Sequence, residues 1–124
     1  MKQERLYPKG RFNETIFVKT YILIRHDVGI VRENTNGRIF VRPRLRIHGS
    51  IDVLNNICRV LHQDLGITPK KLQTNLRVER SKTLYYQSKK DIPSILDYIG
   101  AKESLDKFNS FNLGYQNTTD SLKR

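Results

Sequence analysis

The sequence predicts an α+β fold in which a four-stranded antiparallel sheet is backed by helices, in the order helix, hairpin, helix, hairpin, helix. Residues 38–48 alternate strictly between apolar and mostly basic side chains, which is typical of a strand with one buried face. Residues 51–65 carry apolar side chains at helical spacing. The chain has 124 residues, of which 37% are hydrophobic, so it can build the core of one domain.

The first element, residues 14–25, is apolar and β-branched enough for a strand and long enough for a helix, and periodicity alone does not decide between them. If it is a helix, the order given above follows. Next comes a hairpin with a strand at about residues 29–33 and a turn at Asn36-Gly37, because this dipeptide readily adopts the positive φ angles of a tight turn. Pro43 lacks a backbone N–H group, so it indicates an edge position or a bulge in the basic strand 38–48.

The middle of the chain predicts a second helix and a second hairpin. Ser50 is a suitable N-cap for the helix at residues 51–65, and Gly66 can end it. Residues 72–79 alternate again, and residues 82–87 are rich in strand-forming side chains. We therefore expect these two segments to pair.

The last part of the chain predicts helices followed by a tail. A helix begins at Ser88 or Asp91 and stops at Gly100. A short helix follows at about residues 102–111. Residues 114–124 are polar, and we expect them to be disordered. The domain itself spans residues 13–113, after an N-terminal arm of residues 1–12.

The charge of the chain favours a polyanionic partner. Lys and Arg number 23 against 12 Asp and Glu, a formal net charge of +11. Such an excess concentrates nucleic acid or anionic membrane at the surface. Membrane is disfavoured because no apolar run is long enough to span a bilayer. The N-terminus has no secretory pattern, and the lone Cys58 cannot form an intramolecular disulfide, so we expect an intracellular protein.

The basic strand is the candidate binding surface. It holds four arginines and no acidic residue, and unpaired like charges on one strand face are costly unless a polyanion neutralises them. Guanidinium groups bind guanine or phosphate, amide side chains match adenine, and lysines contact phosphates. The predicted nucleic-acid contacts are Arg32, Arg38, Arg42, Arg44, Arg46, His48, Gln73, Asn75, Arg77, Lys82 and Lys89.

Double-stranded DNA is the first candidate partner and RNA the alternative. A twisted antiparallel sheet that presents arginine can lie along the major groove of a duplex. Common RNA-binding modules instead stack bases on aromatic side chains of a strand, and only Phe40 stands among the arginines. Tyr85 and Tyr86 are neighbours on one strand and therefore face opposite sides, so at least one of them belongs to the core.

Three segments taken together resemble one half of the LAGLIDADG homing endonuclease family. They are Tyr21 to Val31, Asn36 to Ser50 and Ser81 to Ile92, and the likeness covers about residues 13–111. The resemblance implies a homodimer that binds a pseudo-palindromic duplex, one half-site to each copy. It also implies Mg²⁺-dependent cleavage of DNA, if the metal site is retained. A non-catalytic RNA-binding or intron-splicing (maturase-like) helper is the alternative.

The sequence departs from the family at the residues that would carry catalysis. The family's first helix packs on its partner through small residues, where this chain has Ile22 and Leu23. If Gly29 is the glycine of the motif, Val28 takes the metal position and has no oxygen ligand. If the register shifts by one, Asp27 becomes the catalytic and metal-binding carboxylate. His26 next to it is then a candidate proton carrier.

Overall fold

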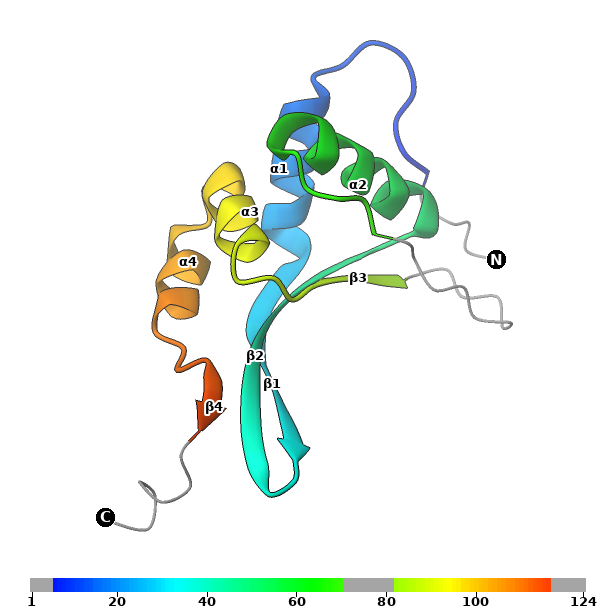
Figure 1. The fold of residues 1–124 in the computed structure, drawn as a ribbon. Coiled ribbons are helices and arrows are strands. Elements are labelled where there is room, and N and C mark those ends of the chain that lie inside the picture. The colour runs from blue at the N-terminus through cyan, green and yellow to red at the C-terminus, as the bar shows by residue number, and fades with distance from the viewer. Residues whose placement is uncertain (1–5, 71–81, 117–124) are drawn as a thin grey trace.

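The structure, a computed structural model, describes residues 6–70 and 82–116 and is an α+β domain. In this part of the chain, four helices accompany one four-stranded antiparallel sheet, which confirms the predicted class at that level (Figure 1). The elements in chain order are α1 (Glu14–Arg25), β1 (His26–Thr35), β2 (Arg38–Gly49), α2 (Ile51–Leu65), β3 (Lys82–Tyr86), α3 (Asp91–Ile99), α4 (Lys102–Asn109) and β4 (Gly114–Gln116).

The segment that periodicity left ambiguous is a helix. Asn13 caps it, because its side-chain oxygen accepts a hydrogen bond from the backbone N–H of Ile16 at 3.0 Å. Val18 and Ile22 are fully buried on the side of α1 that faces the core. Strand β1 starts at the residue after α1 ends, three residues earlier than predicted.

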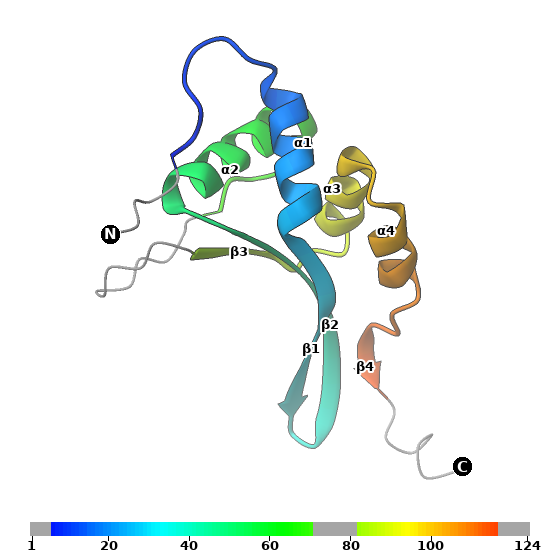
Figure 2. The same ribbon diagram turned by 180° about the vertical axis from the view of Figure 1, so that it is seen from behind.

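Strands β1 and β2 form the predicted hairpin. Asn36 and Gly37 have φ angles of 52° and 78°, as a two-residue turn of this kind requires. The pairing runs without interruption from Thr35 opposite Arg38 to His26 opposite Ile47. The tip of the hairpin projects beyond α1, α2 and α3, as the two opposite views show (Figures 1 and 2).

Strand β2 lies in the middle of the sheet and pairs with β1 from Arg38 to Ile47. Its other side pairs with β3 at Leu45–Gly49 and with β4 at Ile39–Val41. Pro43 therefore lies between the segments of β2 that pair with β4 and with β3. Among the described strands, none pairs with that side of β2 at Pro43. A residue without an N–H group is tolerated at such a local edge.

The fourth strand differs from the one predicted. Residues 72–79, expected to pair with 82–87, lie outside the described residues. The fourth strand in the structure is β4, whose Tyr115 pairs with Phe40 of β2. The expectation that disorder begins at residue 114 is wrong for residues 114–116, because β4 docks there with its aromatic side chain against the hairpin.

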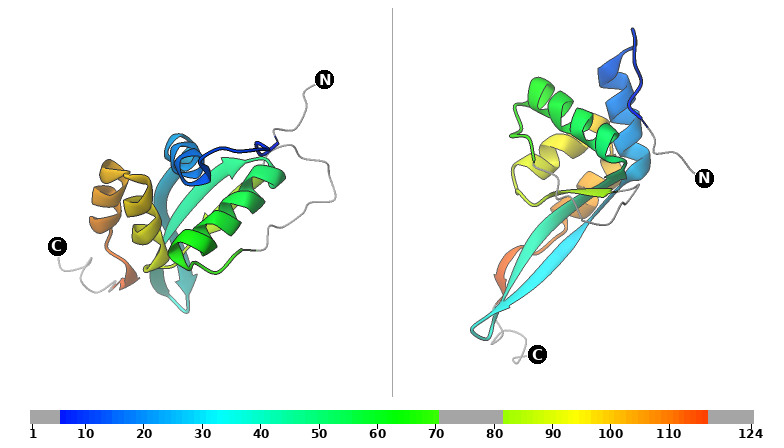
Figure 3. Two further views of the ribbon diagram at one scale, coloured as in Figure 1. Left: turned by 90° about the horizontal axis from the view of Figure 1, so that it is seen from above. Right: turned by 90° about the vertical axis from the view of Figure 1, so that its right-hand side faces the viewer.

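The core lies between one face of the sheet and the helices α1, α2 and α3, which share one side of it (Figure 3). The helix signals read from the sequence are confirmed. The side-chain oxygen of Ser50 accepts a bond from the N–H of Val53 at the start of α2, and Gly66 and Gly100 end α2 and α3 in the left-handed conformation. Tyr7, in the N-terminal arm, is also buried in this core.

Candidate nucleic-acid interface

The sheet has a second face, directed away from the core, which we call the open face. In β2 the odd-numbered side chains from Val41 onward are buried, and the even-numbered ones lie on the open face. Because residues directly opposite each other share a face, the register assigns the neighbouring strands. The open face consists of Asp27, Gly29, Val31, Glu33, Thr35, Arg38, Phe40, Arg42, Arg44, Arg46, His48, Thr83, Tyr85 and Tyr115.

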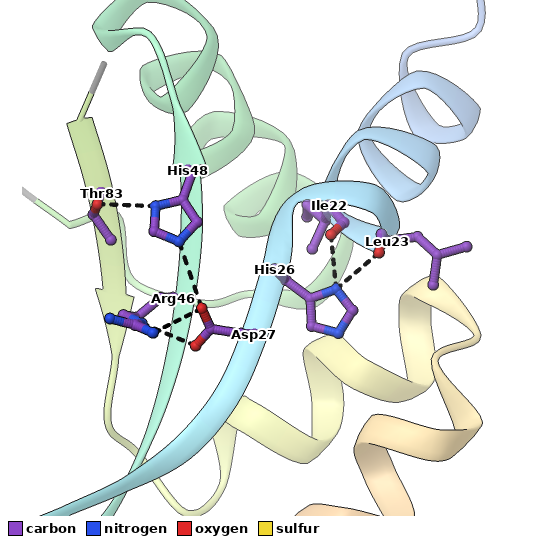
Figure 4. A network of polar contacts seen from close by, with 7 residues as sticks. All are labelled: Ile22, Leu23, His26, Asp27, Arg46, His48 and Thr83. Atoms are coloured by element: carbon purple, nitrogen blue, oxygen red, sulfur yellow. Dashed lines mark hydrogen bonds and ion pairs between the residues drawn. The ribbon is translucent and has the colours of Figure 1, made fainter.

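Two arginines of this face are paired with carboxylates of the same chain. Arg46 donates from Nε to Oδ1 and from Nη2 to Oδ2 of Asp27, each at 2.9 Å (Figure 4). Arg42 donates from Nε to Glu33, which lies diagonally across the ladder. The expectation that the arginine row lacks acidic partners is therefore wrong for these two residues. Residues 38–48 contain no acid, but the adjacent strand supplies two.

The contact between Asp27 and Arg46 perturbs both groups. Hydrogen bonds from Arg46 hold the pKa of the Asp27 carboxyl below its ordinary value, although partial burial opposes this. The same bonds raise the pKa of Arg46. His48 extends the cluster, with Nε2 3.5 Å from Oδ2 of Asp27 and Nδ1 3.2 Å from the hydroxyl of Thr83. Asp27 is thus a carboxylate throughout the neutral pH range.

The other two arginines of the row lie against aromatic rings. The guanidinium of Arg38 is 4.3 Å from the ring centre of Tyr115, and that of Arg44 is 5.9 Å from the ring centre of Tyr85. These cation–π contacts leave the positive charge unneutralised, because a ring carries no net charge. The open face has four arginines and only two carboxylates, so the net charge of this face is positive.

The open face also gathers aromatic side chains in addition to Phe40, which the sequence places among the arginines. Tyr85 is 48% exposed and Tyr115 is 58% exposed, and Phe40 lies between the two arginines Arg38 and Arg42 on β2. Tyr86 is buried, as expected for one member of the adjacent tyrosine pair. Contrary to expectation, Phe40 is therefore not the only ring among the arginines, because β3 and β4 each contribute a ring from a distant part of the sequence.

Several predicted contacts lie elsewhere. Arg32 is opposite Val41 and Lys82 is opposite Gly49, so the register puts both on the other face of the sheet. Lys89 is exposed in the turn before α3 and does not belong to the sheet. The remaining predicted contacts, Gln73, Asn75 and Arg77, lie outside the described residues. The arginine row with His48 is thus the part of the predicted set that one surface brings together.

Asp27 was also the candidate metal ligand, and its surroundings do not fit Mg²⁺. Both of its oxygens accept hydrogen bonds from Arg46, and a cation is beside it instead of further oxygen ligands. Mg²⁺ needs near-octahedral oxygen coordination. Over residues 6–70 and 82–116, no three His, Cys, Asp or Glu side chains come together in a metal-binding group. Val28, the residue at the metal position in the other register, is buried in the core.

His26 points away from Asp27, to the opposite side of β1 (Figure 4). Its Nδ1 is 2.8 Å from the carbonyl oxygen of Ile22, and because a carbonyl only accepts, Nδ1 carries the hydrogen. Its Nε2 is 2.8 Å from the hydroxyl of Ser104 in α4. His26 therefore ties the end of α1 to α4 and is not placed to exchange a proton with Asp27.

The described helices do not include one that is long and apolar enough to cross a bilayer. The open face of the sheet carries arginines, aromatic rings and two carboxylates. Comparison of the chain with protein-family models, with curated proteins and with solved structures found no match.

Proposed function

We propose that this protein binds double-stranded DNA through the open face of its β1–β2 hairpin. The observation that carries the proposal is the β1–β2 hairpin, whose tip projects beyond the helices (Figure 1). Its open face carries a row of arginines, and β3 and β4 flank β2 only at Leu45–Gly49 and Ile39–Val41. The major groove of B-form DNA, about 12 Å wide, admits a ribbon of two strands. An arginine-bearing face can then reach phosphates and base edges together.

The overall charge supports the same partner. A net charge of +11 favours association with any phosphate backbone, and this sequence-independent attraction supplies much of the affinity of DNA-binding proteins. Arg38 and Arg44 have no carboxylate partner among the described residues, so their charge is available to phosphates. Base edges would then be read by the side chains near the middle of the face.

We further propose the LAGLIDADG type of assembly, in which two copies of the chain each bind one half-site. The supporting feature is α1, which leads directly into β1 and exposes apolar side chains. Ile16 is 60% exposed, Leu23 is 45% exposed and Ile24 is 73% exposed. A second copy of α1 would remove these side chains from water. The fold relationship to that family is part of the same proposal.

The proposed activity is binding. Cleavage of the LAGLIDADG type requires Mg²⁺, and Asp27, the carboxylate that the resemblance assigns to the metal, is engaged by Arg46. Among the described residues of one chain, Asp27 belongs to no group of three His, Cys, Asp or Glu side chains that could hold a metal ion. We therefore propose no hydrolytic step.

RNA binding is the second candidate, because of the rings of Phe40, Tyr85 and Tyr115 on the open face. Unstacked bases of single-stranded RNA stack on exposed aromatic side chains, and arginine beside them strengthens the contact. A duplex keeps its bases stacked and would not use the rings in this way. Direct competition between duplex DNA and single-stranded RNA at one salt concentration separates the two functions.

The test is a binding titration by fluorescence anisotropy with labelled duplex DNA and labelled single-stranded RNA. The variant Arg38→Glu/Arg44→Glu reverses two charges of the open face that lack carboxylate partners. Glutamate at position 42 or 46 would instead oppose Glu33 or Asp27 and strain the sheet. The matched control is Lys102→Glu/Lys107→Glu, which changes the net charge equally on exposed residues of α4.

The proposal expects tight, salt-sensitive duplex binding that the open-face variant loses and the control largely keeps. Equal losses in both variants would mean attraction by net charge alone. Preference for single-stranded RNA would favour the second candidate, and absence of binding to either polymer would refute both.

A further inference from the structure

The contact between Arg46 and Asp27 leaves one edge of the guanidinium group unused. Arginine has five N–H donors in a planar fork. Asp27 accepts from the Nε and Nη2 side of that fork. The two hydrogens on Nη1 and the second hydrogen on Nη2 remain at the outer edge. The side chain of Arg46 is 36% exposed and that of Asp27 is 44% exposed, so the pair is accessible to solvent on the open face.

The two hydrogen bonds to Asp27, made at the same time, define the orientation of the guanidinium plane of Arg46. A single contact allows the plane to rotate, whereas a side-on pair of bonds fixes both its direction and its tilt. Asp27 itself is directly opposite Arg46 in the strand ladder, so its backbone position does not vary independently. Tyr85 is the residue directly opposite Arg46 on the other neighbouring strand. Arg46 is thus pre-oriented between β1 and β3 before any ligand arrives.

The free edge of this pre-oriented guanidinium matches one base. Guanine presents two acceptors, O6 and N7, in the major groove, and a bidentate arginine is the commonest specific contact to it. A phosphate offers a similar pair of oxygens but carries no sequence information. A flexible arginine serves phosphate adequately, whereas a base edge at a fixed position gains most from an arginine of fixed orientation.

We propose that Asp27 is a positioning residue that holds Arg46 for bidentate recognition of a guanine in duplex DNA. This inference rests on the proposed duplex binding and assigns to Asp27 a role in base recognition in place of metal binding. Arg42 and Glu33 repeat the arrangement with a single contact, so they hold the guanidinium less firmly. The predicted half-site therefore contains one strongly specified guanine, read by Arg46.

The experiment begins with selection of preferred duplexes from a randomised pool by the whole chain, in EDTA so that no divalent metal takes part. The selected duplex is then changed one base pair at a time, and affinities are measured for four proteins. These are the wild type, Asp27→Asn, Arg46→Lys and the control Glu14→Gln. Glu14 is also paired with an arginine, Arg59, but off the sheet, so its variant makes the same change of charge.

The wild type should prefer one guanine by about fivefold or more, the lower end of what a bidentate arginine–guanine pair contributes. Asp27→Asn should reduce this preference to about twofold or less, because the amide offers one acceptor and cannot hold both nitrogens. Its binding to unrelated duplexes should stay equal or become tighter, since one negative charge is gone. Arg46→Lys should lose the same preference, and Glu14→Gln should keep it.

The outcomes separate the inference from the proposed function. If the wild type binds no duplex, both fail. If it binds, but Asp27→Asn retains the full preference for guanine, the positioning role is refuted and duplex binding stands. Thermal unfolding of each variant shows whether the fold is intact, and a structural role for Asp27 alone would lower stability without changing the ratio of affinities. Loss of preference at the position lost in Arg46→Lys supports the inference.

Discussion

Asp27 and Arg46 join the first two strands near the helical body, and their pairing governs the local charge of the open face. Exposed ion pairs contribute little to stability, because water screens the charges and holding two side chains in one geometry costs conformational entropy. The side chains here are about two-fifths exposed, so the same discount applies. The pair of Asp27 and Arg46 therefore matters more for the orientation of Arg46 and the charge of the open face than for the stability of the protein.

The lowered pKa of Asp27 predicts a small acid dependence of stability. The native state favours the charged form through the hydrogen bonds from Arg46. The resulting stabilisation is fully present above the ordinary aspartate pKa of 3.8 and is lost as the pH falls through the lowered native pKa. The free energy of unfolding of wild type minus that of Asp27→Asn should thus be constant near neutrality and decrease below about pH 4.

Urea unfolding at a series of pH values measures this difference. The pKa of Glu14 is also lowered, chiefly by hydrogen bonds from Arg59, but Glu14 is present in both proteins and its effect cancels. A difference that is the same at about pH 7 and about pH 3 would show that the native state does not favour the charged form of Asp27.

At the scale of elements, the β1–β2 hairpin is the part of the molecule that extends the binding surface away from the helices. Its register depends on the two-residue turn, because the pairing of Thr35 with Arg38 sets every later pair. A slip by one residue would turn the arginines toward the core. The turn therefore protects the composition of the open face as well as the stability of the hairpin.

The turn can be tested with two glycines of the same hairpin. Gly37 has a φ angle of 78°, which a residue with a Cβ adopts at a cost of about 1–2 kcal/mol, so Gly37→Ala should lower the free energy of unfolding by about 1 kcal/mol. Gly29 has no positive φ, and a Cβ added there would meet no atom within 4 Å. Gly29→Ala should leave stability unchanged or raise it slightly. Urea unfolding measures the stability of both variants. Equal losses of unfolding free energy in the two variants would contradict the assignment of the turn.

At the scale of the whole molecule, a surface of arginines makes the strength of binding depend on salt. The logarithm of the binding constant falls with the logarithm of salt concentration, with a slope of about −0.9 for each phosphate contact on duplex DNA. Arg44→Gln should therefore reduce the magnitude of the slope by about 0.9 if Arg44 contacts a phosphate. Anisotropy titrations at several salt concentrations measure it, and an unchanged slope would place Arg44 away from the backbone.

Assembly is the second property of the whole molecule, and α1 is where it is tested. The proposed second copy covers Ile16 and Ile24, so Ile16→Lys/Ile24→Lys should convert a dimer to a monomer in analytical ultracentrifugation. Leu6→Lys is the control, because Leu6 is 63% exposed but lies in the N-terminal arm. A wild type that sediments as a monomer, free and on DNA, would refute the dimer.

Much of the fold was predictable because its signals are local. The Asn36-Gly37 turn, the Ser50 cap and the glycine that ends α2 act within a few residues of the chain, and the structure confirms each. The state of α1 was left open by periodicity, although Asn13, an N-cap residue directly before it, is a local signal for the helix that the structure has. Even the pairing of Asp27 with Arg46 follows from the turn, once β1 is extended back to the end of α1.

The sequence by itself determined a positive, alternating strand and the elements around it, because periodicity and capping depend on neighbours in the chain. Tertiary structure alone decided which distant groups meet that strand. It brought Tyr115 beside Phe40 and Tyr85 opposite Arg46, and it put Lys82 on the other face. Such contacts depend on strand pairing across long stretches of chain, where many partners have similar local preferences and only the packing of the whole core selects one.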